Sequence, residues 1–165
     1  MGIFDIFKKS KKEKVVEIYS PLNGTVISLE EVPDEAFAQK MIGDGCAIEP
    51  SEGGIFAPID AQIDIFDTNH AVSIETKEGL EMIVHFGVDT VKLNGQGLKR
   101  LVNSDEAKKG EKLIEYDLAY LKENAPSVKT PIIVTSMDIV EKIEILGKGE
   151  IKAGDLLMKV YLKNL

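Results

Sequence analysis

Two histidines, His70 and His85, are the only imidazole groups in this chain, so any chemistry near pH 7 that needs imidazole must use one of them. They flank the run TKEG at residues 76–79, which has the composition of a hairpin turn. If Glu75 opposes Leu80 across this four-residue loop, His70 lies directly opposite His85 on one face of the hairpin. A loop one residue shorter or longer would place the two rings on opposite faces, so the sequence predicts a facing pair only in this register.

Two facing imidazoles can divide the work of a phosphoryl transfer. A neutral ring attacks phosphorus with its free nitrogen, and the bond that it forms stays reactive. The other ring can donate a hydrogen bond to the phosphoryl oxygens, and the hydroxyl of Thr68, two residues before His70, is placed to fix the tautomer of that ring. Two alternatives stay open at this point: each histidine has only a structural role, or the pair belongs to a zinc site. A zinc site would need a third ligand at a fixed spacing, and we expect no metal and no cofactor.

The segments around the histidines predict an all-β fold. Strand-like runs separated by Gly, Pro and Asp are expected at residues 15–19, 24–28, 46–49, 54–57, 62–66, 71–76, 81–86, 112–116, 131–135, 143–146 and 156–161. Short helices are expected at 34–41, 97–101 and 118–124. Turn signals every 8 to 12 residues or so are typical of an antiparallel β-sandwich or barrel.

Similar turns recur along the chain. Pro-started turns enter strands at residues 20–26 and 57–63, and Gly-acid turns precede strands at 43–48, 110–114 and 154–158. Such loose matches do not establish a duplication, but they favour a quasi-symmetric sandwich of the duplicated hybrid-motif type, with a few short helical turns.

The charge balance argues against a nucleic-acid partner. Lys and Arg total 20 against 28 Asp and Glu, which gives a net charge of −8, and Arg100 is the only arginine. A polyanion needs a basic face, and the recognition of phosphate usually needs arginine forks. We therefore expect a basic protein as the partner.

Residues 1–14 differ in charge from the rest, because they contain five lysines and two acidic residues. Their apolar residues fall on one side of a helical wheel, so the segment is either a basic amphipathic helix in weak contact with an anionic membrane or a disordered, solvated tail. No apolar run approaches the roughly 18 residues that cross a bilayer, and the single cysteine, Cys46, can form no internal disulfide. These features predict a cytoplasmic protein.

Two other side chains have possible functional interpretations. Cys46 lies in an apolar strand with no adjacent Arg or His to lower its pKa, so an inert core thiol is favoured over a reactive one. Residues 157–160 distantly suggest the attachment lysine of a biotin or lipoyl carrier. Such lysines lie at hairpin tips, whereas Lys159 falls within the last predicted strand, so we expect an outward-facing strand residue.

The motifs around the histidines closely resemble one known family. Residues 68–71 (TNHA) and 84–91 (VHFGVDTV) are similar to the glucose-type enzyme IIA of the bacterial phosphoenolpyruvate-dependent sugar phosphotransferase system, and the likeness extends from about Val16 to Lys163. The resemblance implies a β-sandwich-like barrel. It also implies that residues 15–165 are a single enzyme IIA domain, which accepts phosphate from the phosphocarrier protein HPr and passes it to the cysteine of a sugar-specific IIB domain.

By this resemblance His85 is phosphorylated on Nε2, His70 stabilises the phosphate, and Thr68 orients His70. The family docks its partners on an apolar ring with flanking acids, which would exclude water from the labile phosphoryl group and attract a basic donor. The matching positions are Asp34, Ala36, Phe37, Ile42, Phe66, Ser73, Ile83, Asp89 and Val91.

Two alternatives use other classes of function. A regulatory binding module could hold sugar-uptake or metabolic proteins on the same surface according to the phosphorylation state, because a doubly charged group at its centre would disfavour many docked partners. A metallopeptidase on a related barrel would bind zinc in stoichiometric amount, but its motifs are absent from the sequence.

Overall fold

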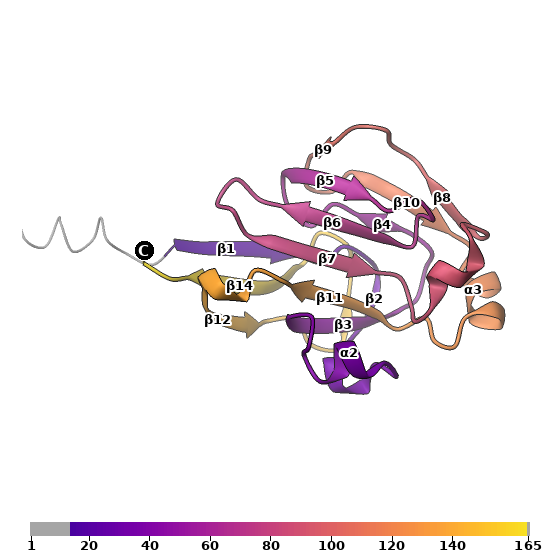
Figure 1. The fold of residues 1–165 in the computed structure, drawn as a ribbon, viewed down its shortest axis with the longest axis horizontal. Coiled ribbons are helices and arrows are strands. Elements are labelled where there is room, and N and C mark those ends of the chain that lie inside the picture. The colour runs from indigo at the N-terminus through magenta and orange to yellow at the C-terminus, as the bar shows by residue number, and fades with distance from the viewer. Residues whose placement is uncertain (1–13, 165) are drawn as a thin grey trace, which may run out of the picture.

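Short antiparallel strands dominate the computed structural model, which describes residues 14–164 (Figure 1). The strands are β1 (Lys14–Tyr19), β2 (Gly24–Ile27), β3 (Asp44–Pro50), β4 (Ile55–Phe56), β5 (Ala61–Ile65), β6 (Ala71–Glu75), β7 (Glu81–His85), β8 (Leu98–Arg100), β9 (Glu106–Ala107), β10 (Lys112–Tyr116), β11 (Thr130–Val134), β12 (Val140–Ile145), β13 (Glu150–Ile151) and β14 (Leu156–Leu162). The helices are η1 (Leu29–Glu31), α2 (Glu35–Ala38), η2 (Thr90–Leu93), α3 (Leu118–Asn124) and η3 (Met137–Ile139).

The strands form one large sheet and two small ones, and they pack as a β-sandwich. The large sheet has the order β13-β2-β3-β11-β7-β6-β5-β9, and the small sheets have the orders β1-β14-β12 and β4-β10-β8. Buried side chains from all three sheets, among them Ile18, Ile114 and Ile132, belong to one apolar cluster. The burial of this cluster between the sheets is the main stabilising contribution to the fold. The prediction of an all-β antiparallel sandwich is confirmed, and the described sheets do not close into a barrel.

All eleven predicted strands are present, and helix α3 has the predicted bounds. The helix expected at 97–101 is wrong, because residues 98–100 form strand β8. Gly97 has a φ of +80°, which interrupts a right-handed helix, and Leu98 pairs with Tyr116 of β10 and is buried. The helix expected at 34–41 is shorter than predicted and ends before Lys40, whose φ is +58°.

The Pro-started turns of the two halves exchange equivalent hydrogen bonds. Tyr19 N donates to Pro58 O (3.0 Å), and Phe56 N donates to Pro21 O (2.7 Å). The sheet orders agree with this symmetry. In the large sheet, β2, β3 and β11, counted from one edge, occupy positions equivalent to those of β5, β6 and β7, counted from the other edge. In the small sheets, β1, β14 and β12 correspond in order to β4, β10 and β8. The sheet orders therefore have the quasi-symmetry that the recurring turns favour.

Two of the three Gly-acid turns take part in this symmetry. Asp155 O accepts from Ser20 N (2.7 Å), and Glu111 O accepts from Ala57 N (2.8 Å), so each turn binds one Pro-started turn. The third similar stretch, residues 43–48, forms most of β3 in the large sheet instead.

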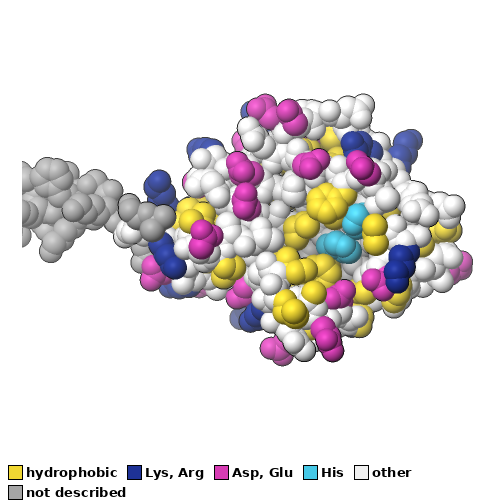
Figure 2. Space-filling view, in the orientation of Figure 1, with side chains coloured by type: hydrophobic (Ala, Val, Ile, Leu, Met, Phe, Trp, Pro, Cys, Tyr) yellow, Lys and Arg dark blue, Asp and Glu magenta, His cyan; other side chains and the backbone are white. Residues whose placement is uncertain are grey.

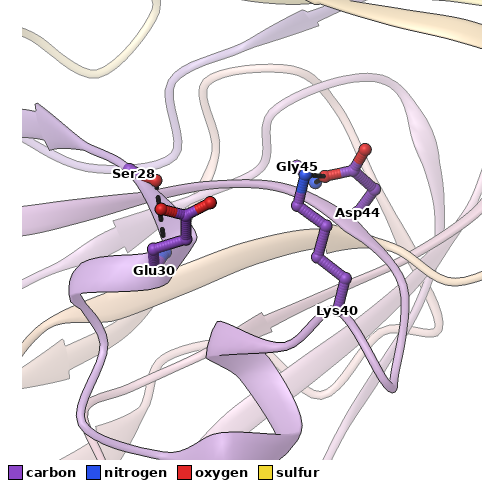
Figure 3. A network of polar contacts seen from close by, with 5 residues as sticks. All are labelled: Ser28, Glu30, Lys40, Asp44 and Gly45. Atoms are coloured by element: carbon purple, nitrogen blue, oxygen red, sulfur yellow. Dashed lines mark hydrogen bonds and ion pairs between the residues drawn. The ribbon is translucent and has the colours of Figure 1, made fainter.

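Local polar contacts hold the segment between β2 and β3, which carries α2 (Figure 3). The hydroxyl of Ser28 accepts from Glu30 N (3.2 Å) and caps η1, and the Glu31 carboxylate accepts from Ser28 N (3.1 Å). At the other end of the segment, Lys40 Nζ lies 3.4 Å from Asp44 Oδ1, which also accepts from Gly45 N (2.8 Å). These contacts fix both ends of a segment that contributes one wall of the site described next.

Candidate active site

Neighbouring strands of the large sheet bring the two histidines together. His85 is the last residue of β7, and His70 comes directly before β6. Their ring centroids are 5.1 Å apart and the ring planes are inclined by 77°. His70 is only 7% exposed, and His85 is half-buried. Figure 2 shows the two rings side by side at the surface, with hydrophobic side chains around them and acidic side chains nearby.

The predicted register of the hairpin is wrong by one residue. Strands β6 and β7 pair Glu75 with Glu81, and Thr76 N donates to Leu80 O (2.9 Å), so only residues 77–79 form the tip. Gly79 closes this three-residue loop with a φ of +88°, a conformation that glycine adopts readily. The position of Gly79 in the sequence is the signal that could have identified this loop.

The histidines meet by a route other than direct cross-strand pairing. In the observed register Ala71 is opposite His85, and strict alternation would turn His70 to the other face. However, β6 begins only at Ala71. His70 belongs to the loop between β5 and β6, where Asn69 has a positive φ of 59°. The alternation of the strand therefore does not determine the direction of the His70 side chain.

A backbone hydrogen bond defines the tautomer of His85. Its Nδ1 lies 2.9 Å from the carbonyl oxygen of Gly87. A carbonyl oxygen only accepts, so Nδ1 carries the proton in the neutral ring and Nε2 keeps its lone pair. The nitrogen that the neutral ring offers as a nucleophile is therefore Nε2.

Thr68 contacts the second histidine, as predicted. Its hydroxyl is hydrogen-bonded to Nδ1 of His70. When the hydroxyl donates this bond, Nε2 of His70 carries the proton of the neutral ring and can donate to an anionic oxygen. Burial lowers the pKa of His70, and the neighbouring His85 lowers it further, so the ring is neutral over most of the physiological pH range.

Two aromatic side chains form walls beside the rings. Phe37 of α2 has its ring centroid 5.1 Å from that of His85, and the Phe66 ring meets His70 edge-on at 5.4 Å. Phe37 is only 6% exposed, because it also packs with Leu29, Val32 and Ile133 in a second apolar cluster. The residue expected to contact partners therefore also stabilises the fold.

The other residues of the predicted docking surface differ in exposure. Ile42 and Val91 are 40% and 45% exposed, as expected for contact residues. Ser73 and Ile83 are paired across β6 and β7 and are half-buried on the same face of the hairpin as His85. Ala36 is half-buried within α2.

The two predicted acids flank His85. Asp34 caps α2 by accepting from Ala36 N (2.9 Å), and Asp89 follows β7 and lies 3.6 Å from Lys92. Burial lowers the pKa of His85, whereas the Gly87 hydrogen bond and the charges of Asp34 and Asp89 raise it, with burial the larger effect. The net effect favours the neutral form of the His85 ring.

A model of one family matches residues 16–140 of this chain, and the description of that family is the phosphoenolpyruvate-dependent sugar phosphotransferase system, EIIA 1. The chain belongs to this family. The glucose-specific EIIA component of Haemophilus influenzae is 45% identical to this EIIA protein, over 99% of the chain and 100% of the relative. The relative from Borreliella burgdorferi is 47% identical, over 87% of this chain and 76% of the relative. The solved glucose permease IIA from Mycoplasma capricolum shares the fold with a TM-score of 0.82 and 39% identity, over 88% of this chain and 96% of the solved one.

Membership assigns this EIIA protein to phosphoryl relay in a sugar phosphotransferase system, and so to the phosphotransferases. The match favours this relay over a regulatory binding module. Between residues 14 and 164, no helix is long and apolar enough to span a membrane. The expected helix or tail at 1–14 lies outside the described residues except for Lys14, which begins β1.

Sequence reasoning missed one contributor to the site of this EIIA protein. The Gly87 carbonyl fixes the tautomer of His85, but a backbone group has no signature in the residue types.

The structure places the two other side chains that the sequence singled out. Cys46 is buried, which raises the pKa of its thiol to about 12, so the group is inert. Lys159 lies within β14, where it pairs with Glu17 of β1 and Glu144 of β12. Among residues 14–164, no three His, Cys, Asp or Glu side chains gather as a metal site requires.

Proposed function

We propose that His85 accepts a phosphoryl group from phosphorylated HPr on Nε2 and passes it to the cysteine of a IIB domain in a membrane sugar permease. The observation that carries this proposal is the bond from His85 Nδ1 to the Gly87 carbonyl, which leaves Nε2 as the free nitrogen of a ring that lies beside His70. Residues 15–165 act as the single EIIA domain. The names of the relatives specify glucose, and we propose glucose as the sugar served.

In the first step, the Nε2 lone pair of His85 forms a bond to phosphorus while the bond from phosphorus to the donor group of HPr breaks. The leaving group departs with the bonding electron pair. In the second step, the thiolate of the IIB cysteine attacks phosphorus, and Nε2 of His85 recovers its lone pair. No other co-reactant is needed, and a neutral imidazole is suitable both as nucleophile and as leaving group.

His70 stabilises the phosphoryl group once it is bonded to His85, so it acts mainly in the onward step. With Thr68 donating to Nδ1, the Nε2 proton of His70 is directed to a phosphoryl oxygen of the group on His85. The rings are 5.1 Å apart between centroids, which leaves room for a phosphoryl group to be bonded to one and hydrogen-bonded to the other.

The surface around the pair serves both partners in turn. The apolar ring of Phe37, Ile42, Phe66, Ile83 and Val91, with Ala36 and Ser73 as smaller contacts, excludes water from the phosphoryl group. Asp34 and Asp89 attract the basic donor HPr and raise its rate of association. The overall charge of −8 acts in the same direction.

Phosphorylation with a defined donor chain tests the assignment. Incubation with phosphoenolpyruvate, enzyme I and HPr should label the protein in an acid-labile, alkali-stable form, and His85→Ala should abolish the label. A label that persists in this variant would overturn the assignment. In His70→Gln, His85 should still be labelled, but transfer to the IIB domain should be badly impaired. Unchanged onward transfer would contradict the role of His70.

The choice of sugar is tested separately. Transfer from the labelled protein is measured to a panel of IIB domains from permeases for different sugars. We expect the fastest transfer to a glucose-specific IIB domain. Equal or faster transfer to another domain would refute glucose as the sugar while leaving the relay on His85 intact.

A further inference from the structure

Arg100, the only arginine of the chain, binds the loop that carries His70. Its Nε donates to Asn69 Oδ1 (3.2 Å), and its Nη2 donates to the carbonyl oxygens of Ile65 (2.9 Å) and Phe66 (3.2 Å). All three acceptors are neutral. Arg100 itself ends β8, whose backbone pairs with β10 in a small sheet. Its side chain therefore links that sheet to the connection between β5 and β6 in the large sheet.

The loop needs this support because of its backbone conformation. Asn69 has a φ of +59°, which is unfavourable for a residue with a Cβ atom unless its surroundings stabilise it. Asn69 N donates to Phe66 O (2.7 Å) within the loop, and its side-chain amide donates to Leu98 O of β8 (3.3 Å). Asn69 Oδ1 accepts from Arg100, so both polar atoms of the Asn69 side chain are hydrogen-bonded to residues of β8.

The two histidines are thus held by different parts of the structure. His85 is fixed at the end of β7 by the Gly87 carbonyl, which Arg100 does not contact. The loop that Arg100 holds carries Thr68, His70 and the Phe66 ring beside His70. A change at Arg100 therefore moves one member of the pair and not the other.

We propose that Arg100 is a positioning residue for phosphoryl transfer, which holds the loop at residues 66–70 so that Thr68 and His70 face the phosphoryl group on His85. The proposal rests on the relay function proposed above. A guanidinium suits this role because its planar fork presents donors in fixed directions to three acceptors, which the single ammonium of a lysine does not.

The first test needs no phosphorylation, so it stands even if the proposed relay were wrong. Two-bond ¹H–¹⁵N correlation spectra report the tautomer and pKa of each ring. In Arg100→Met we expect the His70 resonances to shift or average between tautomers while those of His85 keep the Nδ1-protonated pattern. Lys99→Met is the matched control, because Lys99 is the neighbouring cation on β8 and makes none of the three hydrogen bonds to the loop. Unchanged His70 resonances in Arg100→Met, or an equal change in Lys99→Met, would overturn the proposal.

The second test measures the two transfer steps in Arg100→Met. Misplacing a group that acts on the transition state by about 1 Å costs on the order of 100-fold, so we expect onward transfer to the IIB domain to fall by about 10- to 100-fold. Acceptance from HPr should fall by less than about 3-fold, since His85 is held separately. Arg100→Lys should not restore onward transfer. An equal loss in both steps, or full rescue by lysine, would contradict the positioning role.

A double variant separates positioning from a general effect on the fold. If Arg100 acts through His70, then adding Arg100→Met to His70→Gln should slow onward transfer by less than about 2-fold beyond His70→Gln alone. A further loss as large as that in the single Arg100→Met variant would show that Arg100 acts by another route and would refute the proposal.

Discussion

Replacing Gly87 with alanine should both destabilise the protein and slow phosphoryl acceptance. Gly87 has a φ of +59°, and placing an L-residue in this region costs about 1–2 kcal/mol. The new Cβ would also lie 2.4 Å from Ser127 O and 3.3 Å from Val128 Cα, two backbone atoms that are close because Val88 N donates to Ser127 O. Crowding of this kind typically costs about 1–3 kcal/mol more. We expect a total loss of about 2–5 kcal/mol in the free energy of unfolding.

Gly149→Ala is a matched control for the backbone cost. Gly149 has a φ of +61°, and nothing lies within 4 Å of the position that its Cβ would occupy. Its substitution should cost only about 1–2 kcal/mol. Urea denaturation of both variants measures the difference, which isolates the contact with residues 127 and 128. Equal losses in the two variants would refute the close approach at Gly87.

The same substitution should act on His85, the proposed nucleophile. The Gly87 carbonyl accepts from His85 Nδ1 at 2.9 Å, and a displaced carbonyl weakens this bond. A hydrogen bond of this kind contributes about 0.5–1.5 kcal/mol, so the rate of acceptance from HPr should fall by about 2- to 13-fold, measured where the variant is fully folded. Gly149→Ala should accept at the wild-type rate. A folded Gly87→Ala protein with unchanged acceptance would show that this carbonyl does not prepare Nε2 for attack.

Three further results are expected. Because burial lowers the pKa of His85 below 6.5, the rate of acceptance from HPr should decline only as the pH falls below 6.5. The stability that the neutral ring contributes is lost over the same range, because the ring of the unfolded protein binds its proton first. A rate profile with its midpoint at or above pH 6.5 would contradict this prediction. Phe37→Ala should cost about 3–5 kcal/mol in urea denaturation, because Phe37 is only 6% exposed. Val91→Ala, at a position 45% exposed, should change the free energy of unfolding by less than about 0.5 kcal/mol and raise the KM for HPr. Similar stabilities of the two variants would contradict these roles. Iodoacetamide should modify Cys46 only in the unfolded protein, because burial raises the pKa of the thiol to about 12, and rapid labelling of the native protein would disprove this.

The sequence predicts the strands well because their alternation and turn residues are local signals. Strands β9 and β13, with two residues each, were not predicted, since they exist only through pairing with β5 and β2. The sequence predicts a helix in place of strand β8 for a related reason. Leu98 is apolar in either interpretation, and only its pairing with Tyr116 determines the extended form.

The site was predicted at the level of residue types but not of geometry. The identity of His70, His85 and Thr68 follows from the motifs, and their contacts agree with the expectation. The predicted register is wrong because it assumes a four-residue loop, whereas Gly79, with its positive φ, closes a three-residue loop. The support from Gly87 could not be predicted, because it comes from a backbone carbonyl that has no side-chain signal. The support from Arg100 could not be predicted either, because its side chain donates to backbone carbonyls far away in the sequence.

The quasi-symmetry of the sheets describes the scaffold, and the site lies where this symmetry breaks down. Asn23 Oδ1 accepts from Ala153 N and Asp60 Oδ1 accepts from Lys109 N, both at 2.7 Å, so the two halves retain the same bonds even in their turns. The connections that follow the matched strands β2 and β5 differ.

The connection after β5 is the short loop that presents His70 to His85, whereas the connection after β2 is longer and contains α2, whose Phe37 lies against His85 from another side. His85 lies on β7, which is paired with its symmetry mate β11 at the centre of the large sheet. His85, the proposed nucleophile, is therefore flanked by the connections that follow two matched strands, one of which supplies the second imidazole and the other the aromatic wall. Two identical connections would have supplied two copies of one feature. The proposed relay instead uses two different features, an imidazole and an aromatic wall.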